Sequence, residues 1–251
     1  SYIILVLLVV FLAVCSWLFL KNQKYPFRLP IFVVFLVFWQ SILSGWSDYI
    51  VFWPQIALLD FLMGITTCSL LWILAIRIED KQWLASKKII DSFDKIKPWV
   101  TLAIIITLIE ITLGGWTSVK FASFACPDFP FCQSSWWPNM DLKEGFNFVK
   151  PSSLEVLESE ARVAINVVHR LGALVSMCYL LGLAIFLLTV FDHRVQRIGI
   201  NLIAVLIVQM VLLTYAGYIR DPVILTMVHS LGSLMLLLIL VGLASRMAYA
   251  K

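Results

Sequence analysis

Long apolar runs separated by short polar segments make up most of the sequence, and this pattern predicts the architecture. A helix that crosses a bilayer needs about 20 mostly apolar residues. Seven runs meet this requirement, at roughly 2–20, 29–46, 54–76, 98–116, 163–190, 198–219 and 222–246. Proline lies at or near the start of four runs, where its missing N–H costs least: Pro30, Pro54, Pro98 and Pro222. We therefore predict an all-α integral membrane protein with seven transmembrane helices.

The composition narrows the class of protein further. Hydrophobic residues make up 61% and charged residues 14% of the chain, whereas soluble domains are near half apolar and a quarter charged. This excludes intrinsic disorder, a secreted disulfide scaffold and an ordinary cytosolic enzyme. The net charge of +4 does not indicate a nucleic-acid partner, because Lys and Arg lie almost wholly in short loops. The expected surroundings are the lipid bilayer.

The distribution of basic residues predicts the orientation. Most of the 19 Lys and Arg lie in loops 21–28, 77–97 and 191–197 and at the C-terminus. Because basic loops remain on the cytoplasmic side, we predict a cytoplasmic C-terminus and an outer loop at 117–162. Ser1 would then begin outside on an apolar run without a basic leader, so we expect an upstream segment to precede it.

Two parts of the chain repeat each other. Gln40 and Asp60 are 20 residues apart, as are Gln209 and His229. A small-residue pair and a proline lie between the members of each pair: Ser44-Gly45 and Pro54 in the first copy, Ala216-Gly217 and Pro222 in the second. The chain thus resembles two copies of a four-helix unit, of which the first lacks its opening helix and loop.

This repeat predicts the domain organisation. Residues 1–76 form an incomplete N-terminal bundle of three helices, and residues 77–97 form a cytoplasmic linker. Residues 98–251 form a complete four-helix bundle that includes the outer loop.

Two of the three histidines lie inside predicted spans, where an ionisable side chain is costly and is by default a functional hypothesis. His169 and His229 are at the same depth, roughly 10 Å below the outer surface at 1.5 Å per residue. Two neutral imidazoles at one depth on two helices are what a six-coordinate haem iron requires. The alternative, a hydrogen bond from each His to a neighbouring helix, does not predict matched depth. His193 lies in a loop and needs no such explanation.

The neighbours of the two histidines have two interpretations each. Gly172 and Gly232 each follow a histidine by three residues, and either allow a flat macrocycle close to the backbone or serve helix packing. Arg170 either pairs with a haem propionate or anchors the end of its span at the interface.

Two cysteines share the polar outer loop. Cys126 and Cys132 are most simply a disulfide that closes a proline-stiffened loop, and the alternative is a catalytic redox pair. The other three lie in apolar runs, where a thiol behaves as a small hydrophobe: Cys15, Cys68 and Cys178. Trp136 and Trp137 suit an aromatic belt or a lid over the bundle mouth.

Three further polar residues lie within or beside the spans. Asp60 occupies the position that His229 holds in the other copy, and a carboxylate is a poor substitute for imidazole on a low-spin haem. Glu110 lies about four residues from the outer end of its span, and its role is left open. Asn166 lies one turn from His169 and is either part of the same pocket or a neutral packing residue.

Several stretches of the sequence together resemble a known protein family. The chain resembles the haem A synthase family in its proteobacterial form, over nearly its whole length. The motifs that carry the resemblance are Leu-Gly-Gly-Trp-Thr-Ser (113–118), Ala-Cys-Pro-Asp-Phe-Pro-Phe-Cys-Gln (125–133), Trp-Trp-Pro-Asn-Met-Asp (136–141) and Ala-Arg-Val-Ala-Ile-Asn-Val-Val-His-Arg-Leu-Gly-Ala (161–173). The loop motifs are the more specific.

The resemblance implies two pseudo-symmetric four-helix bundles in the bacterial inner membrane. The C-terminal bundle would hold haem b between His169 and His229, and the disulfide would join Cys126 and Cys132. The N-terminal bundle would take haem O as substrate and oxidise its methyl group to the formyl group of haem A for terminal oxidases. The implied partners are haem O, haem A, an electron donor and the haem O synthase; homo-oligomerisation is left open.

The sequence departs from the family pattern in its first half. The N-terminal Glu-x-x-His-Arg motif, which supplies a proposed catalytic Glu and one ligand, would precede Ser1. The partner ligand position is Asp60, and Asn166 replaces the first histidine of the His-x-x-His-Arg pattern in the second half. The retained half is thus the one that relays electrons or binds a structural haem.

Three functional hypotheses follow. The first is a haem A synthase-like oxidoreductase, and the second is a catalytically inactive haem-binding or oxidase-assembly membrane protein. The third, a membrane thiol oxidase that uses Cys126 and Cys132 with quinone, expects a second reactive cysteine pair outside, which this sequence does not offer.

Overall fold

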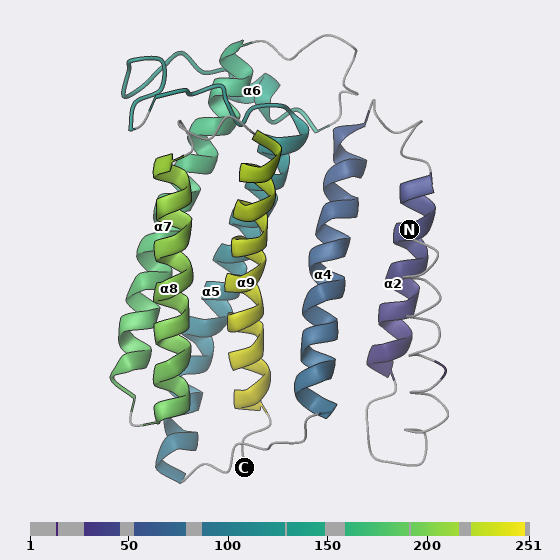
Figure 1. The fold of residues 1–251 in the computed structure, drawn as a ribbon, viewed down its shortest axis with the longest axis vertical. Helices are drawn as coiled ribbons and strands as arrows, with labels where there is room; N and C mark the ends of the chain where they lie inside the picture. The colour runs from purple at the N-terminus through teal and green to yellow at the C-terminus, as the bar shows by residue number, and fades with distance from the viewer. Residues whose placement is uncertain are drawn as a thin grey trace. The chain divides into compact units, whose positions relative to one another are not determined.

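A computed structural model describes residues 28–45, 53–78, 87–128, 130–148, 159–190, 192–215 and 222–248, together with Val14. The described residues form helices joined by loops, as Figure 1 shows. The helices are α2 (Arg28–Gly45), α4 (Pro54–Ile78), α5 (Lys87–Val119), α6 (Leu142–Gly145), α7 (Ser159–Leu188), α8 (His193–Tyr215) and α9 (Pro222–Ala248). Five of them, namely α4, α5, α7, α8 and α9, are long and apolar enough to cross a membrane. The protein is an all-α integral membrane protein, as its hydrophobic pattern predicts.

The predicted spans correspond to the described helices, with some differences in their bounds. Apart from Val14, the span predicted at 2–20 lies outside the described residues, as does the end of the span predicted at 198–219. In α2 the apolar part, Leu29–Leu43, is shorter than the apolar part of the five longer helices.

Helix α5 begins earlier than the sequence pattern predicts. The prediction placed the start of this span at Pro98, but the helix begins at Lys87 and contains Pro98 in its interior. Phe93 and Ile96, which precede the proline, are only 1% and 2% exposed because they pack into the core. Burial of these two side chains extends the helix beyond the long apolar run, and it offsets the hydrogen bond that proline cannot make.

The chain divides into two compact units, residues 1–81 and 82–251. In the first unit α2 packs against α4. Val33 and Val37 of α2 are buried there, and Leu70 and Leu71 of α4 pack against them.

The second unit contains a four-helix bundle of α5, α7, α8 and α9 (Figure 1). Helix α5 packs against α7 and α9, and α8 packs against the same two helices. Helices α7 and α9 are therefore diagonal partners, as are α5 and α8. The core of the bundle includes side chains from all four helices, among them Phe93, Val100, Leu180, Leu187, Leu202, Leu240 and Leu243. This arrangement makes the bundle axis the place where side chains from diagonal helices meet.

The loop between α7 and α8 ends in a helix cap. Oδ1 of Asp192 accepts hydrogen bonds from the backbone N–H groups of Arg194 (2.8 Å) and Val195 (3.4 Å), at the start of α8. The Arg194 guanidinium also lies 3.0 Å from Oδ2 of Asp192. Burial alone would raise the pKa of Asp192, but the hydrogen bonds from Arg194, its positive charge and the hydrogen bond from Val195 outweigh burial and hold the pKa below 3.8.

We expect Asp192→Ala to destabilise the protein by about 1 kcal/mol, the usual effect of losing a helix cap. Because the pKa of Asp192 is lowered in the folded protein, its ionic contribution is complete above the ordinary carboxyl pKa and is lost as the pH falls through the lowered value. Thermal unfolding of detergent-solubilised protein between pH 3 and 7 measures both effects. Asp192→Asn is the matched control: its amide oxygen still caps α8, so it should keep the cap and lose only the ionic contribution and the pH dependence that comes with it. Equal stability of wild type and Asp192→Ala would contradict the assignment.

Candidate functional site

Two histidine rings meet near the axis of the four-helix bundle. His169 lies on α7 and His229 on α9, which are diagonal helices. The centres of their rings are 6.3 Å apart, and the ring planes are nearly perpendicular at 82°. The side chain of His169 is 19% exposed, and His229 is partly buried. The structure thus brings together the two intramembrane histidines that the sequence places at one depth.

Helix α5 contributes a carboxylate to the same place. Oε1 of Glu110 lies 2.8 Å from Nδ1 of His169, and the Glu110 side chain is 16% exposed. Gly114 follows Glu110 by four residues, so it occupies the same face of α5. A Cβ added to Gly114 would lie 3.2 Å from Cε1 of His169, which is tighter than ordinary contact. Glu110 and Gly114 therefore form the surface against which the His169 ring packs.

Helix α8 contributes an amide. Both polar atoms of the Gln209 side chain are shielded from solvent, and neither has a hydrogen-bond partner within the described part of the chain. A Cβ added to Gly232, three residues after His229 on α9, would overlap the Gln209 amide. Each helix of the bundle therefore directs one polar side chain inward at the level of the histidines.

The predicted repeat has a counterpart in the contacts of each unit. In the first unit the Gln40 amide lies against Gly64, with Nε2 3.5 Å from a Cβ added to that glycine. Thr67 donates a hydrogen bond of 3.1 Å to Oε1 of Gln40. In the second unit the Gln209 amide lies closer to its glycine, since a Cβ added to Gly232 would overlap it. Both units thus place a glutamine of one helix beside a glycine of the next, although the two glycines are one residue out of register with the predicted repeat.

The glycines beside the histidines are explained by these contacts. Gly172 lies opposite Glu110, and an added Cβ there would overlap the Glu110 carboxylate. A Cβ added to Gly232 would likewise overlap the Gln209 amide. Of the two interpretations that the sequence leaves open, the structure shows close helix packing that admits a polar side chain.

The two imidazoles have the donor chemistry of a haem iron site, and the distance between their ring centres is compatible with one. A metal bonded at about 2 Å to one nitrogen of each ring, with each ring centre about 1.1 Å further away, places the ring centres about 6 Å apart. The observed spacing is 6.3 Å. Within the described residues no group of three or more His, Cys, Asp or Glu side chains is arranged to hold a metal ion. The pair therefore suits a metal that brings its remaining ligands with it, as the macrocycle of haem does.

A disulfide closes the loop beside this site. Cys126 and Cys132 are joined, as the simplest interpretation of their spacing predicted, and both are 4% exposed. We call residues 122–135 the disulfide loop; Phe129 within it lies outside the described residues. The two cysteines pack against Val163 of α7.

Two polar side chains of α7 hold the disulfide loop. Nδ2 of Asn166 donates to the carbonyl oxygens of Ala122 (2.8 Å) and Ser123 (3.0 Å), and Asn166 is 4% exposed. Arg170, one turn further along α7, donates three hydrogen bonds to loop carbonyl oxygens. These oxygens belong to Cys126 (2.6 Å), Asp128 (2.9 Å) and Phe131 (2.9 Å). The loop is thus attached to the helix that carries His169.

These contacts help to decide between the interpretations that the sequence leaves open for Asn166 and Arg170. The amide nitrogen of Asn166 donates hydrogen bonds to the disulfide loop. These bonds explain why a polar side chain is buried in an apolar span. Arg170 is occupied with the loop backbone rather than simply extended toward an interface. That Arg170 also pairs with a haem propionate stays a prediction.

The other predicted residues lie on α4, on α7 and just after the disulfide loop. Asp60 lies on α4 in the first unit and is partly buried. Trp136 and Trp137 are both 72% exposed, and the Trp136 ring lies 4.7 Å from that of Phe131. The free cysteines within the described residues are Cys68 on α4 and Cys178 on α7, while Cys15 lies outside them.

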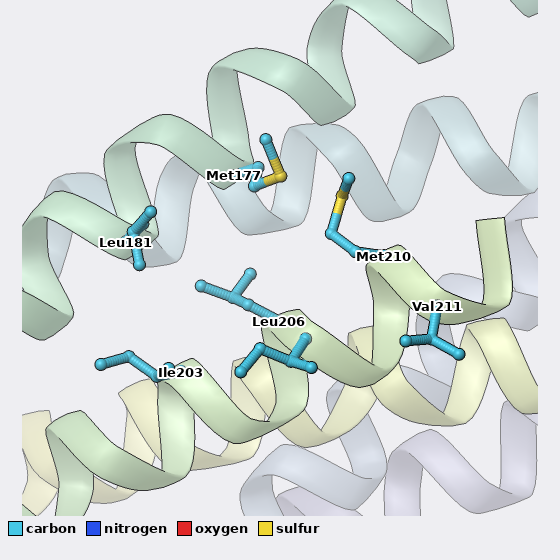
Figure 2. A pocket seen from close by; sticks show the side chains of 7 residues that line it. Met177, Leu181, Ile203, Leu206, Met210 and Val211 are labelled. Carbon is cyan, nitrogen blue, oxygen red and sulfur yellow. The ribbon is translucent and has the colours of Figure 1, made fainter. Parts of the chain in front are cut away.

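An apolar pocket lies between α7 and α8, and Figure 2 shows the side chains around it. Its lining consists entirely of aliphatic and thioether side chains: Met177, Leu181, Ile203, Leu206, Ile207, Met210 and Val211. This lining carries no side chain that exchanges protons near neutral pH, in contrast to the histidine pair.

Sequence reasoning missed the partners of the polar residues. Glu110 was noticed as an intramembrane acid, but its contact with His169 depends on how α5 and α7 are rotated against each other. The spacing of Asn166 and Arg170, one turn apart, was the available signal that one face of α7 binds a polar segment. Gln209 was used only as a marker of the repeat.

Fold and site together define a multi-pass helical membrane protein with a histidine pair near the axis of a four-helix bundle. Residues 3–241 match the family described as cytochrome oxidase assembly protein (COX15-CtaA). The chain is also 30% identical over 235 residues to the protein named Heme A synthase from Shewanella oneidensis, an alignment that covers 92% of this chain and 70% of that relative. The chain belongs to the cytochrome oxidase assembly protein family, and the resemblance found in its motifs is confirmed.

Proposed function

We propose that this protein is a haem A synthase-like oxidoreductase that binds haem b between His169 and His229. The substrate is haem O, whose methyl group is oxidised to the formyl group of haem A for the assembly of terminal oxidases. The observation that carries the proposal is the meeting of the two histidine rings across the bundle at 6.3 Å. The family match and the name of the Shewanella relative support the same activity.

In this proposal each part of the second unit has a defined task. His169 and His229 bind the haem iron, and the bound haem supplies one-electron chemistry. Gly114 and Gly172 keep space around His169 and Glu110. Asn166 and Arg170 fasten the disulfide loop over the helix that carries His169.

The proposal also includes the reaction, the source of its substrate and the position of the chain in the membrane. Two successive hydroxylations of the methyl group would each use one O2, two electrons from an electron donor and two protons, and would each release one water. The resulting hydrated aldehyde loses a third water to give the formyl group. The haem O synthase supplies the substrate. The chain lies in the bacterial inner membrane with its C-terminus in the cytoplasm and the disulfide loop outside, since the basic loops stay on the cytoplasmic side.

The test is the production of haem A. The chain is expressed in cells that make haem O but have no haem A synthase of their own, and the extracted haems are separated by chromatography. We expect haem A to appear, and to be lost when His169 or His229 is replaced by alanine. Extracts that contain haem O but no haem A would contradict the proposed activity.

A second candidate function is a non-catalytic haem-binding assembly protein. The observation that favours it is Asp60, which stands in the first unit where the repeat places a histidine in the second. The same experiment separates the two functions: haem b bound to the purified chain without any haem A in the cells supports the second candidate.

The cysteines allow a further prediction that bears on thiol oxidation. Replacing Cys126 and Cys132 together by serine should destabilise the protein by about 2 kcal/mol, as expected for opening a short loop. We expect the b-type haem to remain, because the disulfide does not touch either histidine ring. Thermal unfolding and the haem spectrum of the double variant measure both. Full stability combined with the loss of a thiol-oxidising activity would instead support a membrane thiol oxidase.

A further inference from the structure

Glu110 is an acidic side chain inside a helix long enough to cross a membrane, where a carboxylate is expensive unless it is paired. Its two carboxylate oxygens are shielded from solvent, as is Nδ1 of His169. The distance between Oε1 of Glu110 and Nδ1 of His169 is 2.8 Å. The imidazole is thus the group that compensates the buried acid.

Two glycines leave room for the contact between Glu110 and His169. Gly172, one turn after His169 on α7, lies directly against the carboxylate, and any side chain there would displace Glu110. Gly114, one turn after Glu110 on α5, lies directly against the His169 ring. A glycine on each helix therefore makes room for the polar group of the other.

We propose that Glu110 is the positioning residue of the haem site, and that its carboxylate accepts a hydrogen bond from Nδ1–H of His169 so that Nε2 is left to bind iron. This inference rests on the proposed haem at His169 and His229. The 2.8 Å distance is that of a hydrogen bond, although the N–H and the oxygen are not yet aligned, so a small rotation of either side chain completes it.

Two physical consequences follow from a carboxylate behind a ligating imidazole. It fixes the tautomer and the orientation of the ring, and it makes the imidazole a stronger donor. It also places negative charge near the iron, which stabilises the ferric state relative to the ferrous state and lowers the reduction potential. His229 has no carboxylate contact of this kind within the described residues. The expected effect on the reduction potential therefore comes through His169.

The test compares haem midpoint potentials in the purified full chain. Glu110→Gln keeps the shape and an acceptor oxygen but removes the charge, and we expect the ferric-to-ferrous preference to fall about tenfold, a rise of about 60 mV for a one-electron couple. Glu110→Leu also removes the acceptor and should weaken haem binding by about 10–100-fold. Thr112→Val is the matched control, since Thr112 lies on the same helix and its hydroxyl bonds to Leu108 of that helix. Its potential should equal that of wild type.

Gly172→Ala provides an independent variant, because the added methyl group displaces the carboxylate without changing its charge. We expect its potential to rise toward that of Glu110→Gln. A structural ion pair would change the unfolding temperature and leave the potential unchanged. Glu110→Gln and Gly172→Ala proteins that bind haem with the wild-type potential would therefore overturn this inference alone. A wild-type chain that binds no haem would overturn the proposed function and this inference together.

Discussion

Replacing His169 or His229 by alanine is expected to abolish the low-spin haem signal of the purified protein. In the proposed site each imidazole would hold the haem iron from one side, and the remaining histidine alone would not keep the iron low-spin. Loss of a direct ligand should lower haem affinity by more than the 10–100-fold that loss of a supporting contact costs. Haem content per chain, measured as the pyridine haemochrome, should therefore fall steeply in both variants.

The third histidine offers a matched control for this prediction. His193 lies at the start of α8, where Nδ1 is 3.2 Å from Oε1 of Gln196. His193→Ala removes one imidazole from the same bundle without touching the pair, and its haem content should equal that of wild type. A His169→Ala or His229→Ala protein with full low-spin haem would show that the iron is held elsewhere.

The second large effect is expected at Arg170. Arg170→Ala removes a charged donor from three loop carbonyl oxygens, at Cys126, Asp128 and Phe131. Hydrogen bonds from a charged group contribute about 1.5–3 kcal/mol each and are not additive, so we expect a loss of about 3 kcal/mol. Thermal unfolding and limited proteolysis of the disulfide loop measure the effect, and the loop should be cleaved faster.

Arg170→Lys is the matched variant, because it keeps the charge but loses the planar fork. An ammonium group on a flexible chain cannot hold three carbonyl oxygens in the same geometry, so an intermediate loss of stability is expected. Equal stability of all three proteins, with unchanged cleavage of the loop, would contradict the role of Arg170 in holding it.

The fold follows closely from local features of the sequence. Apolar runs of spanning length predict the long helices, and the start of α4 at Pro54 agrees with the prediction. The start of α5 was missed because Phe93 and Ile96 lie in a segment with charged neighbours, and only their burial against other helices reveals that the helix continues there.

Part of the site could also be predicted from the sequence. Depth along a helix can be counted in residues, so the pairing of His169 and His229 was predictable. The contact between Glu110 and His169 was not, because it depends on the rotation of α5 against α7, and two glycines leave room for it at the contact. The hold of Arg170 on the loop depends likewise on a backbone path that no local pattern specifies.

Binding of one haem iron between His169 and His229 is tested most directly by the reduced-minus-oxidised absorption spectrum of the purified wild-type chain, measured with its haem-to-protein ratio. We expect a low-spin b-type spectrum with haem bound by this histidine pair. A chain that carries no haem, or one whose haem is high-spin in both oxidation states, would contradict this proposal.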